Sequence, residues 1–182
     1  MLMKADQSLL VIIDVQTKLA PVIHQSDKLI ARMRWLGEIA NELDIPVLVT
    51  EQYPKGLGIS VDDLEGVITN AQVIEKMHFS AVQEPNFMTA MTDINRPQIL
   101  LMGMEAHVCI LQTALDLLAD DYQVFVVEDA VGSRRDSDKQ AALKRLRQAG
   151  AIIVTTEMAA YEWLFKSGTD QFRHITKNWI RG

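Results

Sequence analysis

Residues 9–14 read LLVIID, five apolar residues in succession followed by a carboxylate. Further short apolar or β-branched runs occur at residues 45–50, 72–76, 98–103, 122–127 and 151–155. Most of them are continuously apolar rather than alternating, which is typical of strands covered on both faces. Amphipathic helical patterns lie between them, at residues 28–43, 108–119 and 138–149. This alternation predicts a three-layer α/β/α sandwich, Rossmann-like, built on a mostly parallel six-stranded sheet.

Composition and charge limit the classes of protein to which the chain can belong. With 182 residues, 48% of them hydrophobic, it is long enough for one proper core and short for two. We therefore expect a single domain over residues 1–182. The net charge is -6 and the basic residues are scattered, so the clustered positive surface that nucleic acids or anionic membranes need is not expected. A small-molecule substrate is the better prediction.

The start of the chain and its cysteine count bear on the compartment. Residues 1–8 lack the basic start and small-residue cleavage site of a signal peptide. No apolar run approaches the roughly 20 residues that span a bilayer. The single cysteine allows no internal disulfide, so we expect a cytoplasmic protein.

Three chemically unusual residues fall at the ends of predicted strands. Asp14 ends the first run, Lys76 ends the third, and Cys109 follows the fourth, where the next helix begins. The carboxyl ends of parallel strands share one edge of the sheet, and ligands bind there. A carboxylate that takes a proton, a nearby ammonium and a helix N-terminus together activate a thiol. We therefore expect Cys109 to be a nucleophile with a lowered pKa, and Lys76 to keep Asp14 ionised.

Each of these residues also has an ordinary interpretation. A lone cysteine is more often a packed core residue than a nucleophile, and Lys76 alone could be solvated. Asp14 must be paired or face a site, because burying it unpaired would cost several kcal/mol. Phosphotransferases of the haloacid-dehalogenase type also begin on such an aspartate, but they need a second one where this chain has Gln16. A receiver-like switch would need an acidic pair near Asp14 and is disfavoured.

Three segments around these residues carry a family resemblance. They are residues 9–16 (LLVIIDVQ), Lys76 with the FSA of residues 79–81 behind it, and residues 103–109 (GMEAHVC). They resemble the signatures of the isochorismatase-like hydrolases, and the similarity runs over essentially the whole chain. Residues 50–58 and 128–134 are similar to the subgroup called isochorismatase domain-containing proteins.

The resemblance implies that Asp14, Lys76 and Cys109 form a catalytic triad. It also implies a non-proline cis peptide bond, which would fall between Glu105 and Ala106. That bond would turn the Ala106 N–H toward the Cys109 N–H and so form an oxyanion hole. Many relatives carry Thr where this chain has Ala106, so a side-chain hydroxyl is missing while the backbone donors are retained.

The family is chemically mixed, and the differences narrow the prediction. Its nicotinamidases bind a divalent metal through an Asp-x-His segment and a further His. The corresponding residues 51–55 (EQYPK) contain no histidine, so we expect no metal and no other cofactor. Isochorismatases proper cleave a vinyl ether by acid catalysis that needs no thiol. Because Cys109 is retained, we expect C–N, amide-type hydrolysis through a covalent thioester. A vinyl ether hydrolase and a non-catalytic oligomeric binding protein are the alternatives.

Some residues have weaker signals. The candidate substrate contacts are Gln16, Gln52, Tyr53 and Phe79. His107 lies two residues before Cys109 and either packs to hold the turn, which we favour, or acts as a general base.

Aromatic residues gather near the end of the sequence, at Trp163, Phe165 and Trp179. We interpret them as core residues or as part of a subunit interface rather than as ligand contacts. Relatives in the family commonly assemble, so we expect a homo-oligomer.

Overall fold

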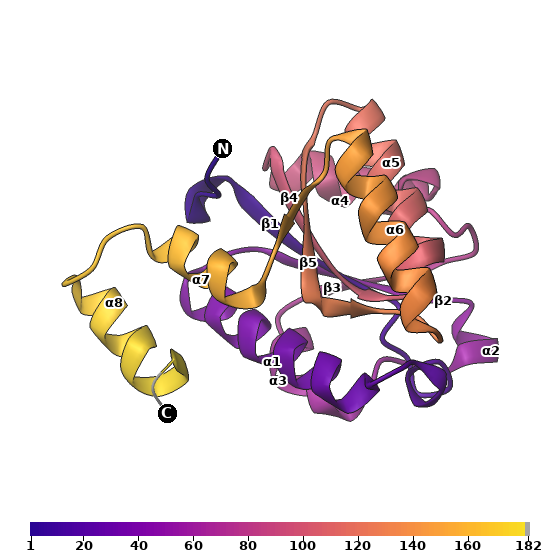
Figure 1. Ribbon diagram of the computed structural model, residues 1–182, viewed down its shortest axis with the longest axis horizontal. Coiled ribbons are helices and arrows are strands. Elements are labelled where there is room, and N and C mark those ends of the chain that lie inside the picture. The colour runs from indigo at the N-terminus through magenta and orange to yellow at the C-terminus, as the bar shows by residue number, and fades with distance from the viewer. Residues whose placement is uncertain (181–182) are drawn as a thin grey trace.

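The computed structural model describes residues 1–180 and contains one sheet (Figure 1). Its strands are β1 Ser8–Ile13, β2 Val47–Gln52, β3 Gln72–Lys76, β4 Gln98–Met104, β5 Gln123–Gly132 and β6 Ile152–Val154. They lie in the order β3-β2-β1-β4-β5-β6, and every neighbouring pair is parallel. The six-stranded, mostly parallel sheet predicted from the apolar runs is therefore confirmed.

Helices cover both faces of this sheet, which completes the three layers. They are α1 Ser26–Glu42, α2 Pro54–Leu57, α3 Glu65–Ile68, α4 Pro85–Ile94, α5 Leu111–Ala119, α6 Asp136–Ala149, α7 Thr156–Leu164 and α8 Asp170–Ile175. Helices α1, α3 and α7 pack on one face, and α4, α5 and α6 pack on the other (Figure 1). Within residues 1–180, no helix is long and apolar enough to cross a membrane.

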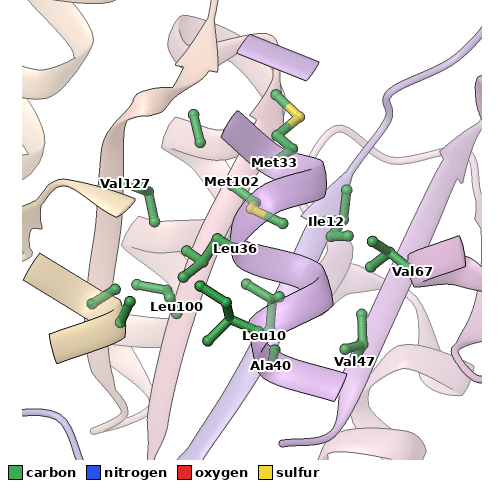
Figure 2. Close-up of a cluster of buried hydrophobic side chains, with 14 of the residues drawn as sticks. Leu10, Ile12, Met33, Leu36, Ala40, Val47, Val67, Leu100, Met102 and Val127 are labelled. Atoms are coloured by element: carbon green, nitrogen blue, oxygen red, sulfur yellow. The ribbon is translucent and has the colours of Figure 1, made fainter. Parts of the chain in front are cut away.

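The core on the α1 face shows why the continuously apolar runs form strands. Leu36 and Ala40 of α1 pack onto Leu10 of β1 and Leu100 of β4 (Figure 2). A fully buried leucine of this kind contributes about 1.5–3 kcal/mol. Alternate residues of the same strands face the other helix layer, so both faces of the sheet are buried.

Two segments of the chain differ from the sequence prediction. Residues 51–70 contain β2 up to Gln52, then α2 and α3, although no helix is expected there from the sequence. Pro54 occupies the first turn of α2, where its missing N–H costs nothing. β5 continues five residues past the predicted end at residue 127, because its register against β4 shifts between Leu101 and Gly103.

The C-terminal segment packs at one end of the molecule (Figure 1). The Trp35 indole of α1 donates a hydrogen bond to the Trp179 carbonyl at 2.6 Å, and the Trp179 indole donates to Glu38. Trp163 is buried and donates to the Ser8 hydroxyl, whereas Phe165 is 81% exposed. Trp163 is thus a core residue, as expected.

The strand order determines where a ligand can bind. β1 leads through α1 to β2 on one side, while β4 lies against the other side of β1. Crevices in open parallel sheets form beyond the carboxyl ends of the strands at such a switch point. Asp14 follows β1 and Cys109 follows β4, so both residues lie at this point.

Candidate active site

Asp14 directly follows β1 and is completely buried. Its backbone takes a left-handed conformation, with φ of 54°, which aspartate tolerates better than most residues. Its N–H donates to the Thr50 carbonyl at 3.1 Å, and its Oδ1 accepts from the Thr50 hydroxyl at 2.7 Å. The neighbouring strand β2 therefore fixes both the backbone and the carboxylate of Asp14.

Lys76 is the last residue of β3 and supplies the opposite charge. Its Nζ lies 2.8 Å from the Asp14 Oδ2, and both side chains are fully buried. The ammonium also donates to Gln52 Oε1 at 2.5 Å and to the carbonyls of His78 at 3.2 Å and Phe79 at 3.1 Å. A buried ion pair is stable only when its remaining protons are satisfied in this way.

Gly103 lets β4 approach β1 beside Asp14. It has φ of +127°, and a Cβ atom placed on it would lie 2.1 Å from the Ile13 carbonyl oxygen. Only glycine fits this backbone conformation and this approach. The close contact brings the end of β4, and Cys109 in the segment that follows it, next to the end of β1.

The connection between β4 and α5 contains a cis peptide bond between Met104 and Glu105. The expected position, between Glu105 and Ala106, is therefore wrong by one residue. The resemblance places the bond only relative to Cys109, and no proline in the segment marks it. The following turn, Ala106–Ile110, carries Cys109 in front of α5.

Cys109 lies against both charges and is only 6% exposed. Burial raises the pKa of its thiol to about 12, and the negative charge of Asp14 adds to this shift. The Lys76 charge acts in the opposite direction but does not compensate. The expected lowering of the Cys109 pKa is therefore wrong, because burial and the carboxylate outweigh the ammonium. The resting thiol therefore keeps its proton at neutral pH.

Burial also raises the pKa of Asp14, while the Lys76 charge and the hydrogen bonds from Lys76 and Thr50 oppose this shift. A carboxylate with a raised pKa is a stronger base than an exposed one. The thiol of Cys109 lies close enough to this carboxylate for each group to shift the pKa of the other. The site therefore contains a protonated thiol beside a carboxylate, and an ammonium that stabilises the charge of that carboxylate.

A thiolate titration tests this resting state. The ultraviolet absorbance of the thiolate, taken as wild type minus Cys109→Ser, is expected to stay flat until well above the pKa of a free thiol, about 8.5. It should then rise toward a midpoint of about 12, or at alkaline unfolding if that comes first. A midpoint below that of a free thiol would contradict the buried, protonated thiol.

Gln16 does not face a ligand. It is fully buried, and its Nε2 donates to the carbonyls of Gln52 at 3.0 Å and Gly58 at 2.6 Å. Its Oε1 accepts from the Gln52 N–H at 2.8 Å. Gln16 thus fastens the end of β2 to the segment around α2. Its candidate role as a substrate contact is corrected to a structural one, because every polar atom of the amide is occupied by backbone.

The other candidate contacts surround Lys76. Gln52 accepts from the Lys76 ammonium and donates to the Met77 carbonyl at 2.9 Å. The N–H of Tyr53 donates to the Lys76 carbonyl at 2.9 Å. The side chains of Tyr53 and Phe79 are 48% and 54% exposed, so they are available at the rim of the site.

The residues just before Cys109 have structural partners. Glu105 pairs with Arg134 at 2.9 Å, and the His107 Nδ1 lies 2.9 Å from the Ser133 hydroxyl. His107 therefore holds the β4–α5 turn against the end of β5, which agrees with the favoured prediction. Ala106 is buried in the same turn as Cys109.

No group of three or more His, Cys, Asp or Glu side chains is arranged to hold a metal ion anywhere in residues 1–180. Within residues 51–55, the segment expected to lack metal ligands, the side-chain amide of Gln52 is hydrogen-bonded to Lys76 and Met77. A surface cavity of about 560 Å³ is lined by residues between positions 20 and 30 together with Val61 and Asp63, and Asp14, Lys76 and Cys109 are not among them.

Sequence reasoning missed two residues of the site. Thr50 ends an apolar run and gives no signal of its contact with Asp14. Glu84 binds the turn after Lys76, and the only hint is Glu-Pro at the start of a helical pattern.

The model of the isochorismatase domain family matches residues 8–158, which include Asp14, Lys76 and Cys109. The chain belongs to the isochorismatase family. Mouse isochorismatase domain-containing protein 2A is 37% identical over 175 residues, which cover 94% of this chain and 82% of the mouse protein.

Two solved structures share the fold. A Caenorhabditis elegans protein described as the MAR1 ribonuclease is 36% identical, with a TM-score of 0.91 over 97% of this chain and 91% of that one. The Escherichia coli YcaC gene product, described as an octameric hydrolase of unknown specificity, is 24% identical, with a TM-score of 0.91 over 99% and 91% of the two chains.

Proposed function

We propose that this isochorismatase-family protein is a metal-independent cysteine hydrolase that cleaves a C–N, amide-type bond in a small molecule. The observation that carries the proposal is the buried Asp14–Lys76 ion pair, 2.8 Å long, with the thiol of Cys109 against it. The thiol of Cys109 packs among apolar residues, but it is also close enough to Asp14 and Lys76 for both charges to shift its pKa.

The first half of the reaction transfers one proton and forms one bond. As the Cys109 sulfur attacks the acyl carbon, Asp14 takes the thiol proton, and the carbonyl electrons move to oxygen. The N–H groups of Ala106 and Cys109 are the proposed donors to this oxyanion. Asp14 then gives its proton to the leaving nitrogen, the C–N bond breaks, and a thioester and a free amine result.

The second half returns the enzyme to its starting state. A water molecule attacks the thioester while Asp14 accepts its proton, and the same N–H groups stabilise the second oxyanion. The C–S bond breaks, the sulfur recovers the proton from Asp14, and a carboxylic acid leaves. Lys76 transfers no proton in either half; its positive charge favours the anionic form of Asp14 that begins each half.

Vinyl ether hydrolysis is the second candidate, and one observation favours it. Burial raises the pKa of Asp14, which suits a carboxylic acid that protonates a substrate. This route leaves the thiol without a role. The ribonuclease description of the worm relative is not extended to this chain, because the net charge of -6 with scattered basic residues opposes binding to phosphates.

The test is a screen of small amides, ureides and imides against the wild type and Cys109→Ala. Released amine is measured, and intact mass spectrometry detects the thioester on the trapped enzyme. Turnover that depends on the thiol, with an acyl adduct on Cys109, supports the proposal. A protein that hydrolyses nothing in the screen and whose thiol is unreactive toward acyl donors would instead be the non-catalytic binding protein.

We further propose that the protein is a cytoplasmic homo-oligomer. Helix α7 and the residue after it expose Met158, Tyr161 and Phe165 at helical spacing, with exposed fractions of 48%, 43% and 81%. Light scattering is expected to give a mass above that of one chain, and Tyr161→Glu should lower it. Lys144→Glu, at an exposed position of α6, is the control that should leave the mass unchanged. A single-chain mass for the wild type would contradict the proposal.

A further inference from the structure

Glu84 makes an unusual set of contacts at the turn that follows β3. Its Oε1 accepts from the Met77 N–H at 2.8 Å, the His78 N–H at 3.0 Å and the His78 Nδ1 at 2.9 Å. Glu84 is also the residue that precedes α4, yet its side chain does not cap that helix. The carboxylate instead turns back toward the strand that ends in Lys76.

The turn held by Glu84 is the one that binds the Lys76 ammonium. The carbonyls of His78 and Phe79 accept from Lys76 Nζ at 3.2 and 3.1 Å. Two of the four groups around the ammonium therefore belong to the turn whose Met77 and His78 N–H groups are bound by Glu84. If the turn moved, Lys76 would lose these two acceptors and Asp14 would lose a fixed partner.

The far side of the same turn is attached to the helix that follows Cys109. The Ser80 hydroxyl donates to Asp116 at 2.7 Å, and the Ala81 N–H donates to the Thr113 hydroxyl at 3.0 Å. Both acceptors lie on α5. The turn thus connects the strand that ends in the ammonium with the helix that follows the thiol, and Glu84 closes its free side.

We propose that Glu84 is a positioning residue, which fixes the turn after β3 so that the His78 and Phe79 carbonyls hold the Lys76 ammonium against Asp14. As a role in catalysis, this rests on the proposed hydrolase function. The backbone N–H of His78 and of Met77 lower the pKa of Glu84 to about 2, so the acceptor is charged at every working pH. The Glu84 side chain is 18% exposed, and hydrogen bonds to a charged group are stronger than those between neutral groups.

Two conservative variants separate this role from a charge at the start of α4. Glu84→Gln keeps the length and an acceptor oxygen but loses the charge. Glu84→Asp keeps the charge and is a good residue before a helix, but it is too short to reach the turn. A positioning role predicts that Gln replaces Glu84 and Asp does not; a helix-charge role predicts the reverse.

The direct measurement is the exchange rate of the Lys76 ammonium protons with solvent, followed by NMR on protein with isotope-labelled lysine. The signal is assigned by its loss in Lys76→Met. Exchange is expected to be slow in the wild type, at least about tenfold faster in Glu84→Ala and Glu84→Asp, and within about threefold of the wild type in Glu84→Gln. Glu75→Ala removes the same charge one residue before Lys76, on an exposed face of β3, and should leave the exchange rate unchanged.

Several outcomes would overturn the proposal. The proposal is contradicted if the Lys76 ammonium protons exchange at the wild-type rate in Glu84→Ala or in Glu84→Asp. It is also contradicted if they exchange as fast in Glu84→Gln, or in Glu75→Ala, as in Glu84→Ala. If Glu84→Ala does not fold, the Gln and Asp variants decide.

A second measurement tests whether the positioning of Lys76 by Glu84 affects turnover. On a substrate found in the screen, kcat should fall by about tenfold in Glu84→Asp with little change in KM, because binding surfaces are kept and only the base is disturbed. The expected order of exchange rates among the variants can be observed even if no substrate is found. In that case the positioning of Lys76 by Glu84 stands, and the hydrolase function fails.

Discussion

Cys109→Ala is expected to lower kcat for amide-type substrates by about 10³-fold or more, while KM changes little. In the proposed route the sulfur forms the only covalent bond to the substrate, and the chain has no other cysteine to replace it. The loss is large because Asp14 then has no nucleophile to deprotonate except water. Released amine and acid, measured on the same samples, give kcat and KM.

Cys109→Ser is the matched control for this prediction. It retains a hydroxyl of similar size in the same buried position, so folding and substrate binding should survive. Its alcohol is a weaker acid than the thiol, and the kcat loss should approach that of the Ala variant. Turnover that persists in both variants would contradict the thioester route and favour acid catalysis by Asp14 on an ether.

Lys76→Met is expected to cost about 3–5 kcal/mol of unfolding free energy at neutral pH. The Asp14 carboxylate is fully buried and would remain without its ionic partner. Burial already raises the pKa of Asp14 and Lys76 opposes the shift, so removing Lys76 raises the pKa further. The stability loss should therefore shrink as the pH falls and Asp14 takes up a proton. Urea unfolding at several pH values measures both effects.

The double variant Asp14→Asn with Lys76→Met separates stability from chemistry. It removes both charges at nearly constant volume, so most of the lost stability should return. Asparagine also tolerates the left-handed backbone at position 14. Activity should nevertheless be lost, because no base remains. A double variant no more stable than Lys76→Met would mean that the pair is not coupled in the way its distance indicates.

The sheet and the placement of the triad follow from features that a sequence displays directly. Apolar runs of strand length are visible without a partner, and a parallel sheet brings their carboxyl ends to one edge whatever the details of packing. Asp14 and Lys76 were predicted from this argument, and the structure brings them to 2.8 Å. Cys109 was predicted by the same reasoning and lies against both.

Other features depend on contacts that a sequence does not display. The contacts of Glu84 depend on a turn whose N–H groups converge on one carboxylate oxygen. The hydrogen bonds of Gln16 depend on backbone segments that lie far from it in the sequence. The sign of the Cys109 pKa shift was wrong because it is a difference between burial and two opposing charges. Nearness to Lys76 is visible in a pattern of residues, but the degree of burial is not.

The tight approach at Gly103 has a consequence for any survey of tolerated substitutions. Every other residue type would press against the Ile13 carbonyl and drive the two central strands apart. A mutational scan scored on turnover would then rank this glycine beside the reacting residues, although it has no functional group. A second scan scored on folded abundance would reveal it as an architectural position, since alanine there should deplete the protein itself while Cys109→Ser should not.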